Sequence, residues 1–288
     1  MCLIAFAIDA SQRWPLVIAA NRDEFFSRPT LPLARWKTAS GQEIISGRDL
    51  RGGGTWLGMT PGGRVAFVTN VRQAQTQTAP RSRGELVTRW LEAIGDASTF
   101  VATLDKHSGA YGGFNLVLGD LRQNAWTWVT NKSIVTLSGW HVQGLLPGVY
   151  GLSNAALDTR WPKTMALKQV LSMALANQES KFNPKALQAT LWTALSNRKR
   201  APLANLPATG VSLALEEALS SAFVEFAEHA YGTRCSSVLL IRGNNSGECA
   251  QRWQVQMEER TPRRLGPNEV AEDCVSFSSA AARFELIP

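Results

Sequence analysis

The chain begins with MCLIAFAID at residues 1–9 and continues with LVIAANRDEF at residues 16–25. Its two short apolar runs are separated by SQRWP, which contains the Ser and Pro typical of a turn. The pattern therefore predicts a β-hairpin that begins at Cys2. Three interpretations of this cysteine stand open: a strand residue, a lipid anchor, or a nucleophile exposed by removal of Met1.

The apolar run at Cys2 lacks the features of a leader peptide. No basic segment precedes it and it reaches Asp9 at once, whereas the modified cysteine of a lipoprotein follows its apolar stretch. No run approaches the roughly eighteen consecutive apolar residues that a membrane span needs. We therefore expect a cytoplasmic protein with no membrane span and no metal site, whose four cysteines are reduced thiols.

The composition is that of a globular chain with a substantial core. The 288 residues are 44% hydrophobic and 18% charged, and no repeat, low-complexity tract or linker divides them, so we expect one domain over residues 1–288. The formal charge of +7 is spread along the chain without a nucleic-acid motif. This favours a solvated surface or attraction to an anionic small molecule over nucleic acid.

Strands dominate the first half of the chain and return at its end. Apolar runs predict them at 2–8, 16–20, 44–46, 56–60, 65–69, 114–118, 125–129, 237–242, 253–257 and 284–287. One helix is predicted to begin at Ser82, which forms a capping box with Glu85. Apolar residues at helical spacing predict further helices at 161–176, 184–195 and 213–229, the last closed by Gly232. Strands, then helices, then strands, without βαβ alternation, indicate an α+β fold.

Several apolar segments stop at polar residues. LVIAA ends in NRDE at 21–24, VAFVT ends in Asn70, YGLS ends in Asn154, and YGT leads through Arg234 into CSSVLLI. Each residue alone is a common strand stop. The guanidinium of Arg234 can also orient a thiolate or a carboxylate.

Combined with Cys2, these residues favour an N-terminal nucleophile. Removal of Met1 would put a thiol and an α-amine with a pKa of about 7.7 to 8.0 on the same residue, where the amine can act as the base. Such a site needs amide donors for the oxyanion, for which Asn70 and Asn154 are suited. Asp23 is suited to hold the ammonium in place.

At this point the chain resembles two nested families: the cysteine branch of the N-terminal nucleophile hydrolases and, more closely, the NRDE family, also called the Transport and Golgi organisation protein 2 family. The close resemblance is carried by motifs that run in order over most of the chain: MCLI at 1–4, AANRDEF at 19–25, GGTWLG at 53–58, TN at 69–70, RGELV at 83–87, YGGFNL at 111–116, YGLSN at 150–154 and YGTR at 231–234. Coverage is weak over roughly 163–228 and in the tail.

The resemblance to the hydrolases implies a four-layer αββα sandwich with the nucleophile on its first strand. It implies that Cys2 is the nucleophile and that Asp23 is the carboxylate near the amine. It places Asn70 and Asn154 in the network that holds the oxyanion and the amine. It also matches Arg234 to an arginine that these hydrolases carry late in the chain.

One position departs from the cysteine hydrolases, which carry an arginine three residues before the aspartate. Here that position is Ala20, and Arg22 directly precedes Asp23. Both positions face the same side of an ideal strand but lie about 6.6 Å apart. We therefore expect Arg22 to point to a different partner and assign it to ligand contacts, which leaves the activity of Cys2 open.

The resemblance to the NRDE family implies a role in haem trafficking and in tolerance of lipid and acyl-CoA stress. We expect the chain to bind haem or an acyl-CoA-like amphipathic anion, without a required cofactor, and assign ligand contacts to Gly53, Gly54 and Trp56 besides Arg22. The Gly52–Gly54 run forms either a backbone nest for an anion or a tight turn.

Two alternatives remain at the level of function. In the binding protein, the axial ligand to haem iron is open, because His107, His141 and His229 lie in no haem-attachment motif. In the enzyme, Cys2 hydrolyses a non-peptide C–N or acyl-thioester bond. The oligomeric state is not fixed by the sequence.

Overall fold

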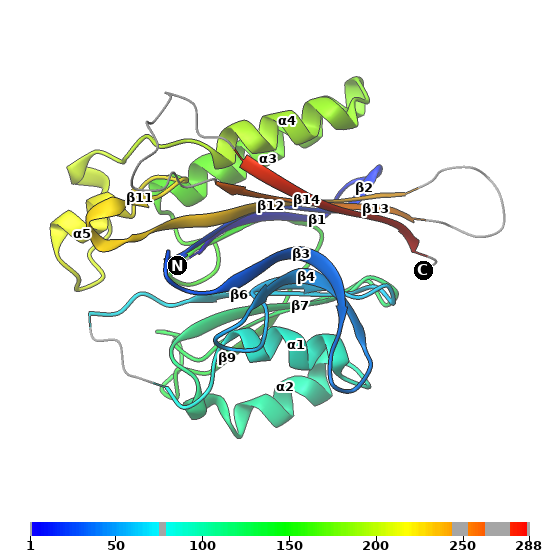
Figure 1. Cartoon of the computed structure of the whole chain (residues 1–288), viewed down its shortest axis with the longest axis horizontal. Helices are drawn as coiled ribbons and strands as arrows, with labels where there is room; N and C mark the ends of the chain where they lie inside the picture. The colour runs from blue at the N-terminus through cyan, green and yellow to red at the C-terminus, as the bar shows by residue number, and fades with distance from the viewer. Residues whose placement is uncertain (1, 75–78, 244–252, 263–276, 287–288) are drawn as a thin grey trace.

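The computed structural model describes residues 2–74, 79–243, 253–262 and 277–286. Its strands form two antiparallel sheets that pack face to face, and helices cover the outer face of each sheet (Figure 1). These four layers confirm the predicted α+β class and the αββα sandwich.

The first sheet joins strands from both ends of the chain, in the order β10-β1-β2-β12-β13-β14 with β11 paired to β12. The hairpin predicted from the opening residues is its centre. The strands are β1 (Cys2–Ser11), β2 (Trp14–Phe25), β10 (Gly148–Leu152), β11 (Glu225–Phe226), β12 (Tyr231–Gly243), β13 (Trp253–Pro262) and β14 (Phe277–Leu286).

The second sheet follows the order of the sequence from β3 to β9, so each strand pairs with its neighbour along the chain. Its strands are β3 (Thr30–Lys37), β4 (Glu43–Asp49), β5 (Leu57–Met59), β6 (Arg64–Asn70), β7 (Phe114–Asp120), β8 (Ala125–Thr130) and β9 (His141–Gly144).

Two pairs of helices complete the layers. The outer face of the first sheet packs against α3 (Pro162–Ser180) and α4 (Pro184–Leu195), and that of the second sheet against α1 (Gly84–Glu92) and α2 (Ala97–Asp105). The short α5 (Leu213–Ala218) leads towards β11. In the part of the chain that the structure describes, no helix is long and apolar enough to cross a membrane.

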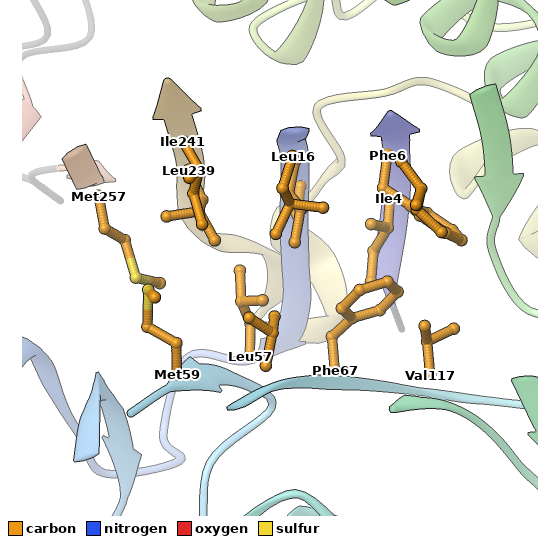
Figure 2. Packing of buried hydrophobic residues seen from close by; sticks show 14 of the residues in the cluster. Ile4, Phe6, Leu16, Leu57, Met59, Phe67, Val117, Leu239, Ile241 and Met257 are labelled. Carbon is orange, nitrogen blue, oxygen red and sulfur yellow. The ribbon is translucent and has the colours of Figure 1, made fainter. Parts of the chain in front are cut away.

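Alternate residues of β1 pack into different layers. Ile4 and Phe6 face the second sheet and meet Phe67 there (Figure 2), whereas Leu3 and Ala5 face α3 and α4. Because both faces of the strand are buried, its sequence is apolar without alternation, as expected for a strand in an inner layer.

The helix predicted over 213–229 is wrong beyond Ala218. Two carbonyl groups that a longer helix would use internally accept side-chain hydrogen bonds: Leu219 from Lys163 Nζ at 2.8 Å and Ala222 from Asn21 Nδ2 at 2.8 Å. The chain then extends into β11, and Gly232, predicted to end this helix, lies in β12. Tertiary hydrogen bonds thus override helical spacing.

The predicted capping box is also absent. Arg83 occupies the N-cap of α1 without a side-chain cap, and Glu85 pairs with Arg81 instead of reaching back to Ser82. Strands β3, β9 and β10 and helix α2 were not predicted. Most residues of β3 and β9 are exposed or only partly buried, so they lack a long apolar signal.

Candidate functional site

A cavity of about 930 Å³ lies beside the first residues of β1 and is lined by residues from both sheets. Six of the predicted site residues line it, namely Cys2, Arg22, Asp23, Trp56, Asn70 and Arg234. The structure therefore brings together residues from distant parts of the sequence.

Cys2 is buried at the edge of this cavity, with 7% of its surface exposed. It pairs with Arg22 across β1 and β2, and its carbonyl accepts a hydrogen bond from Ser153 Oγ at 2.9 Å. Burial raises the pKa of the Cys2 thiol, and the nearby Arg22 guanidinium opposes this rise. The thiol is thus kept protonated unless a base lies next to it.

Arg22 lies near Cys2, but its guanidinium faces two carboxylates, in line with the expectation of a different partner. It lies directly opposite Cys2, and its Nη2 lies 3.7 Å from carboxylate oxygens of both Glu24 and Asp49. Its Nη1 is buried and has no hydrogen-bond partner. The arginine thus remains beside Cys2 despite its altered sequence position, with donor capacity to spare.

Asp23 lies on β2 with 1% of its surface exposed. Its Oδ1 accepts a hydrogen bond from Thr233 Oγ1 at 2.8 Å, and its backbone carbonyl accepts one from Tyr231 OH at 3.0 Å. Burial raises the pKa of the Asp23 carboxyl, and the Lys163 ammonium opposes this rise. A carboxylate held in this way is suited to orient an amine at the start of β1.

The two predicted asparagines form a pair that joins the sheets. Asn154 Nδ2 donates to the Oδ1 of Asn70 at 2.9 Å and to its backbone carbonyl at 3.1 Å. Asn70 lines the cavity, whereas Asn154 is 1% exposed and lies behind it. Asn70 is therefore the amide placed to meet a ligand, and Asn154 fixes its orientation.

A β-bulge brings Arg234 to the cavity. The pairing of β12 with β2 shifts between Thr233 and Cys235, so Arg234 is the extra residue. Its Nη2 donates to Thr30 Oγ1 at 3.0 Å and its Nη1 donates to the carbonyl of Phe26.

Gly53 and Gly54, which the sequence assigned to ligand contacts, do not line this cavity, although Gly52 does. The glycine run is a tight turn in which Gly53 has a positive φ of 74°. Asp49 occupies the concave side of this turn, accepting hydrogen bonds from the Arg51 and Gly52 amides at 3.0 and 3.1 Å. Trp56, also assigned to ligand contacts, lines the cavity.

Positive charge dominates the lining. The described lining residues include four acidic residues and seven arginines, namely Arg22, Arg28, Arg48, Arg51, Arg81, Arg83 and Arg234. Arg28 pairs with Asp49 at 2.8 Å and Arg81 pairs with Glu85. Within the described residues, Arg48, Arg51, Arg83 and Arg234 form no ion pair, so the cavity presents guanidinium groups whose charge is not neutralised locally.

Sequence reasoning missed Lys163, which lies in the first turn of α3 with 5% of its surface exposed. Burial lowers the pKa of its ammonium group to about 8, against the attraction of Asp23. The sequence does indicate that Lys163 is buried, because it lies four and eight residues before the buried Leu167 and Leu171 and so on the same face of the helix.

A buried ion pair between Arg72 and Glu216 was also missed. Their side chains are 5% and 2% exposed, and the Arg72 guanidinium stacks on Trp161 at 4.7 Å. The Arg72 amide donates to the carbonyl of Asn154 at 2.7 Å. The pair therefore supports the two asparagines from the side away from the cavity. No sequence motif indicated it, because Arg72 lies in a loop and Glu216 in the short helix α5.

The three histidines lie away from the cavity lining. The His141 ring packs against Trp128 and the His229 ring against Phe226. Of the four cysteines, Cys2 and Cys235 are free thiols, and Cys249 and Cys274 lie outside the described residues.

Comparison with known proteins gives consistent matches along the chain. The family model described as "Transport and Golgi organisation 2" matches residues 1–256. The human Transport and Golgi organization protein 2 homolog is 33% identical over 258 residues, covering 84% of this chain and 88% of the human protein. The mouse homolog is 31% identical over 261 residues, covering 85% of this chain and 90% of the mouse protein. A solved structure, the Caenorhabditis elegans N-acylethanolamine-hydrolyzing acid amidase ortholog, is 13% identical with a TM-score of 0.47, covering 83% of this chain and 92% of that one.

Proposed function

Because this chain belongs to the Transport and Golgi organisation 2 family, we propose that it binds an amphipathic anionic small molecule in the cavity beside Cys2. The observation that carries the proposal is the arginine-rich lining, in which four guanidinium groups form no ion pair with another described residue. Guanidinium groups bind phosphate and carboxylate through two parallel hydrogen bonds, so this lining suits an anionic head group.

Between the two expected ligands, the lining favours an acyl-CoA-like molecule over haem. Phosphates and propionates both suit the arginines, but haem iron needs an axial ligand, and the histidines lie elsewhere. The thiolate of Cys2, which lines the cavity, could bind iron, but burial raises the pKa of this thiol and so disfavours the thiolate. An acyl-CoA needs no such ligand.

A titration of the purified chain with palmitoyl-CoA and, separately, with haem tests this proposal. Arg51→Met and Arg83→Met each remove a lining guanidinium without breaking an ion pair, and we expect each to weaken binding of palmitoyl-CoA about tenfold, as for a lost charged hydrogen bond. Arg122→Met removes an exposed arginine outside the lining and is the control. Equal affinities in all four proteins would contradict the proposal.

The arrangement around Cys2 favours a second candidate, hydrolysis of a thioester or a non-peptide amide. After loss of Met1, the α-amine of Cys2 takes the thiol proton and the thiolate attacks the substrate carbonyl carbon. Asn70 is placed to stabilise the oxyanion, and Asp23 to hold the ammonium. The leaving thiol or amine takes the proton, and water then cleaves the acyl-cysteine to release the acid and regenerate Cys2.

Two measurements test this candidate separately from binding. Mass spectrometry of the mature chain is expected to give the mass without Met1, and Cys2→Ala is expected to abolish release of CoA from palmitoyl-CoA while retaining ligand binding. A retained Met1, or turnover by Cys2→Ala equal to that of wild type, would eliminate the hydrolase and leave the binding proposal standing.

A further inference from the structure

The loop between β8 and β9, residues 131–140, holds three large apolar side chains in solvent. The exposed fractions of Ile134, Val135 and Leu137 are 98%, 75% and 111%. Apolar side chains exposed together in this way mark an interaction surface. We refer to Ile134, Val135 and Leu137 as the apolar tip.

Hydrogen bonds at its base hold the apolar tip away from the body of the protein. Ser133 N donates to the carbonyl of Gly139 at 2.7 Å, and Thr136 Oγ1 donates to the carbonyl of Trp140 at 2.9 Å. Asn131 Oδ1 accepts from the amide of Phe114 at 2.8 Å. The loop is therefore hydrogen-bonded at its base, while its three large apolar side chains stay mostly exposed.

The loop begins next to the cavity. The Lys132 side chain packs on Gly113, where an added Cβ would lie 2.9 Å from Lys132 Cγ. Gly113 follows Gly112 of the cavity lining, and its carbonyl accepts a hydrogen bond from Arg83 at 3.3 Å. A surface that seats the apolar tip would thus lie close to the ligand cavity.

We propose that the apolar tip inserts into the surface of a lipid bilayer that carries anionic head groups. An aliphatic tip with a tryptophan and basic side chains at its base is suited to the membrane interface, where the aliphatic groups enter the acyl region. Trp140 packs on Phe114 at the base, and the Lys132 side chain lies on the neighbouring Gly113. Asn131 of the loop donates a hydrogen bond to the carbonyl of Ser108. Lys106, two residues before Ser108, is exposed and adds positive charge near the loop, and the exposed Asp105 partly offsets that charge.

The size and shape of the apolar tip favour a bilayer over a protein partner. A stable protein interface buries roughly 1,200 to 2,000 Å² in total with a matched surface on both sides, which three projecting side chains do not supply. A fluid interface needs no matched surface, and anionic lipids complement both Lys132 and the net charge of +7.

Docking goes beyond the proposed function, because it does not require the cavity to be filled. The two are complementary, since an amphipathic anion partitions into bilayers and would reach the cavity from the docked face. A test without ligand therefore separates failure of docking from failure of ligand binding.

The test is co-sedimentation of the ligand-free chain with phosphatidylcholine vesicles that contain about one third phosphatidylglycerol. We expect the wild type to sediment with these vesicles, and Ile134→Ser/Leu137→Ser to bind at least about tenfold more weakly, because the double variant removes two aliphatic side chains that would enter the acyl region. Ile94→Ser is the matched control, because Ile94 is also 98% exposed but follows α1.

Charge dependence completes the design. Lys132→Glu is expected to weaken binding to the mixed vesicles, and pure phosphatidylcholine vesicles are expected to bind the wild type less. Thermal melting checks that each variant folds. The proposal would be overturned if the wild type stayed in the supernatant or if the double variant bound the vesicles equally well. It would also be overturned if the double variant changed its oligomeric state without vesicles, because that would indicate a protein interface.

Discussion

Buried and partly buried polar groups lie around Cys2, and each is paired with a group from another part of the chain. Asp23 bonds to Thr233, Asn70 to Asn154, and Cys2 to Ser153 through its carbonyl. Burial of such groups is costly unless they are paired, so the polar network favours one arrangement of the two sheets. The contribution of buried charge to stability can be tested at Lys163 and at Glu216.

Lys163 gives a pH dependence of stability. Its pKa is lowered to about 8 in the folded chain, whereas the unfolded chain holds the proton up to about pH 10.4. Between these values the unfolded state binds more protons, so this group makes the free energy of unfolding rise with pH. We expect the free energy of unfolding of wild type minus that of Lys163→Met to increase from about pH 7 to about pH 10 in urea titrations. Lys181→Met, at an exposed lysine, controls for net charge; a constant or falling difference would contradict the expectation.

Glu216 compensates the buried charge of Arg72. Replacement by Gln keeps the shape but leaves the guanidinium without its counter-charge, which typically costs about 3 to 5 kcal/mol. We expect Glu216→Gln to lower the free energy of unfolding in urea by that amount, and Arg72→Met/Glu216→Leu to lose less, because the double variant buries no charge. A loss below about 1 kcal/mol in the single variant would show that the pair does not contribute as described.

Local elements place these residues at the cavity. The bulge at Arg234 adds one residue to β12 and turns the guanidinium towards Thr30. The turn at Gly53 and Gly54 wraps Asp49 and so positions Arg51 at the cavity. Both features are single-residue irregularities of strands or turns.

Close packing of the glycine turn on α1 makes Gly54 sensitive to substitution. An added Cβ would lie 2.4 Å from the carbonyl oxygen of Gly84, which is backbone and cannot rotate away. We expect Gly54→Ala to lower the free energy of unfolding by about 1 to 3 kcal/mol, as overpacking does. Gly62→Ala is the control, because its Cβ would meet only Thr60 Oγ1 at 3.6 Å. Equal melting temperatures for the two variants would contradict this account.

Apolar runs predicted most of the buried strands and α3 and α4, because inner strands and core-facing helices carry long apolar signals. The same reasoning failed at 219–229, where carbonyls of Leu219 and Ala222 bond to distant Lys163 and Asn21. It also missed the exposed β3. Contacts between distant segments decide these regions, and local spacing does not record them.

The two sheets together make the site. Cys2, Asp23 and Arg234 come from the first sheet, and Asn70 from the second. Polar residues at strand ends and the resemblance to a family together predicted these positions, and the structure gathers them at one cavity. The arginine-rich lining was not predicted, because its members are scattered from Arg22 to Arg234 and no spacing relates them. Only the packing of the sheets reveals it.

Ligand protection of Cys2 shows whether an amphipathic anion occupies the cavity beside this residue. The rate of Cys2 alkylation by iodoacetamide is measured by peptide mass spectrometry, with and without saturating palmitoyl-CoA. The wild type is compared with Arg122→Met, which serves as a binding-competent control. We expect palmitoyl-CoA to slow alkylation of Cys2 several-fold in both proteins, and to slow it less in Arg83→Met. An unchanged rate at saturation, with binding verified in the same sample, would contradict this expectation.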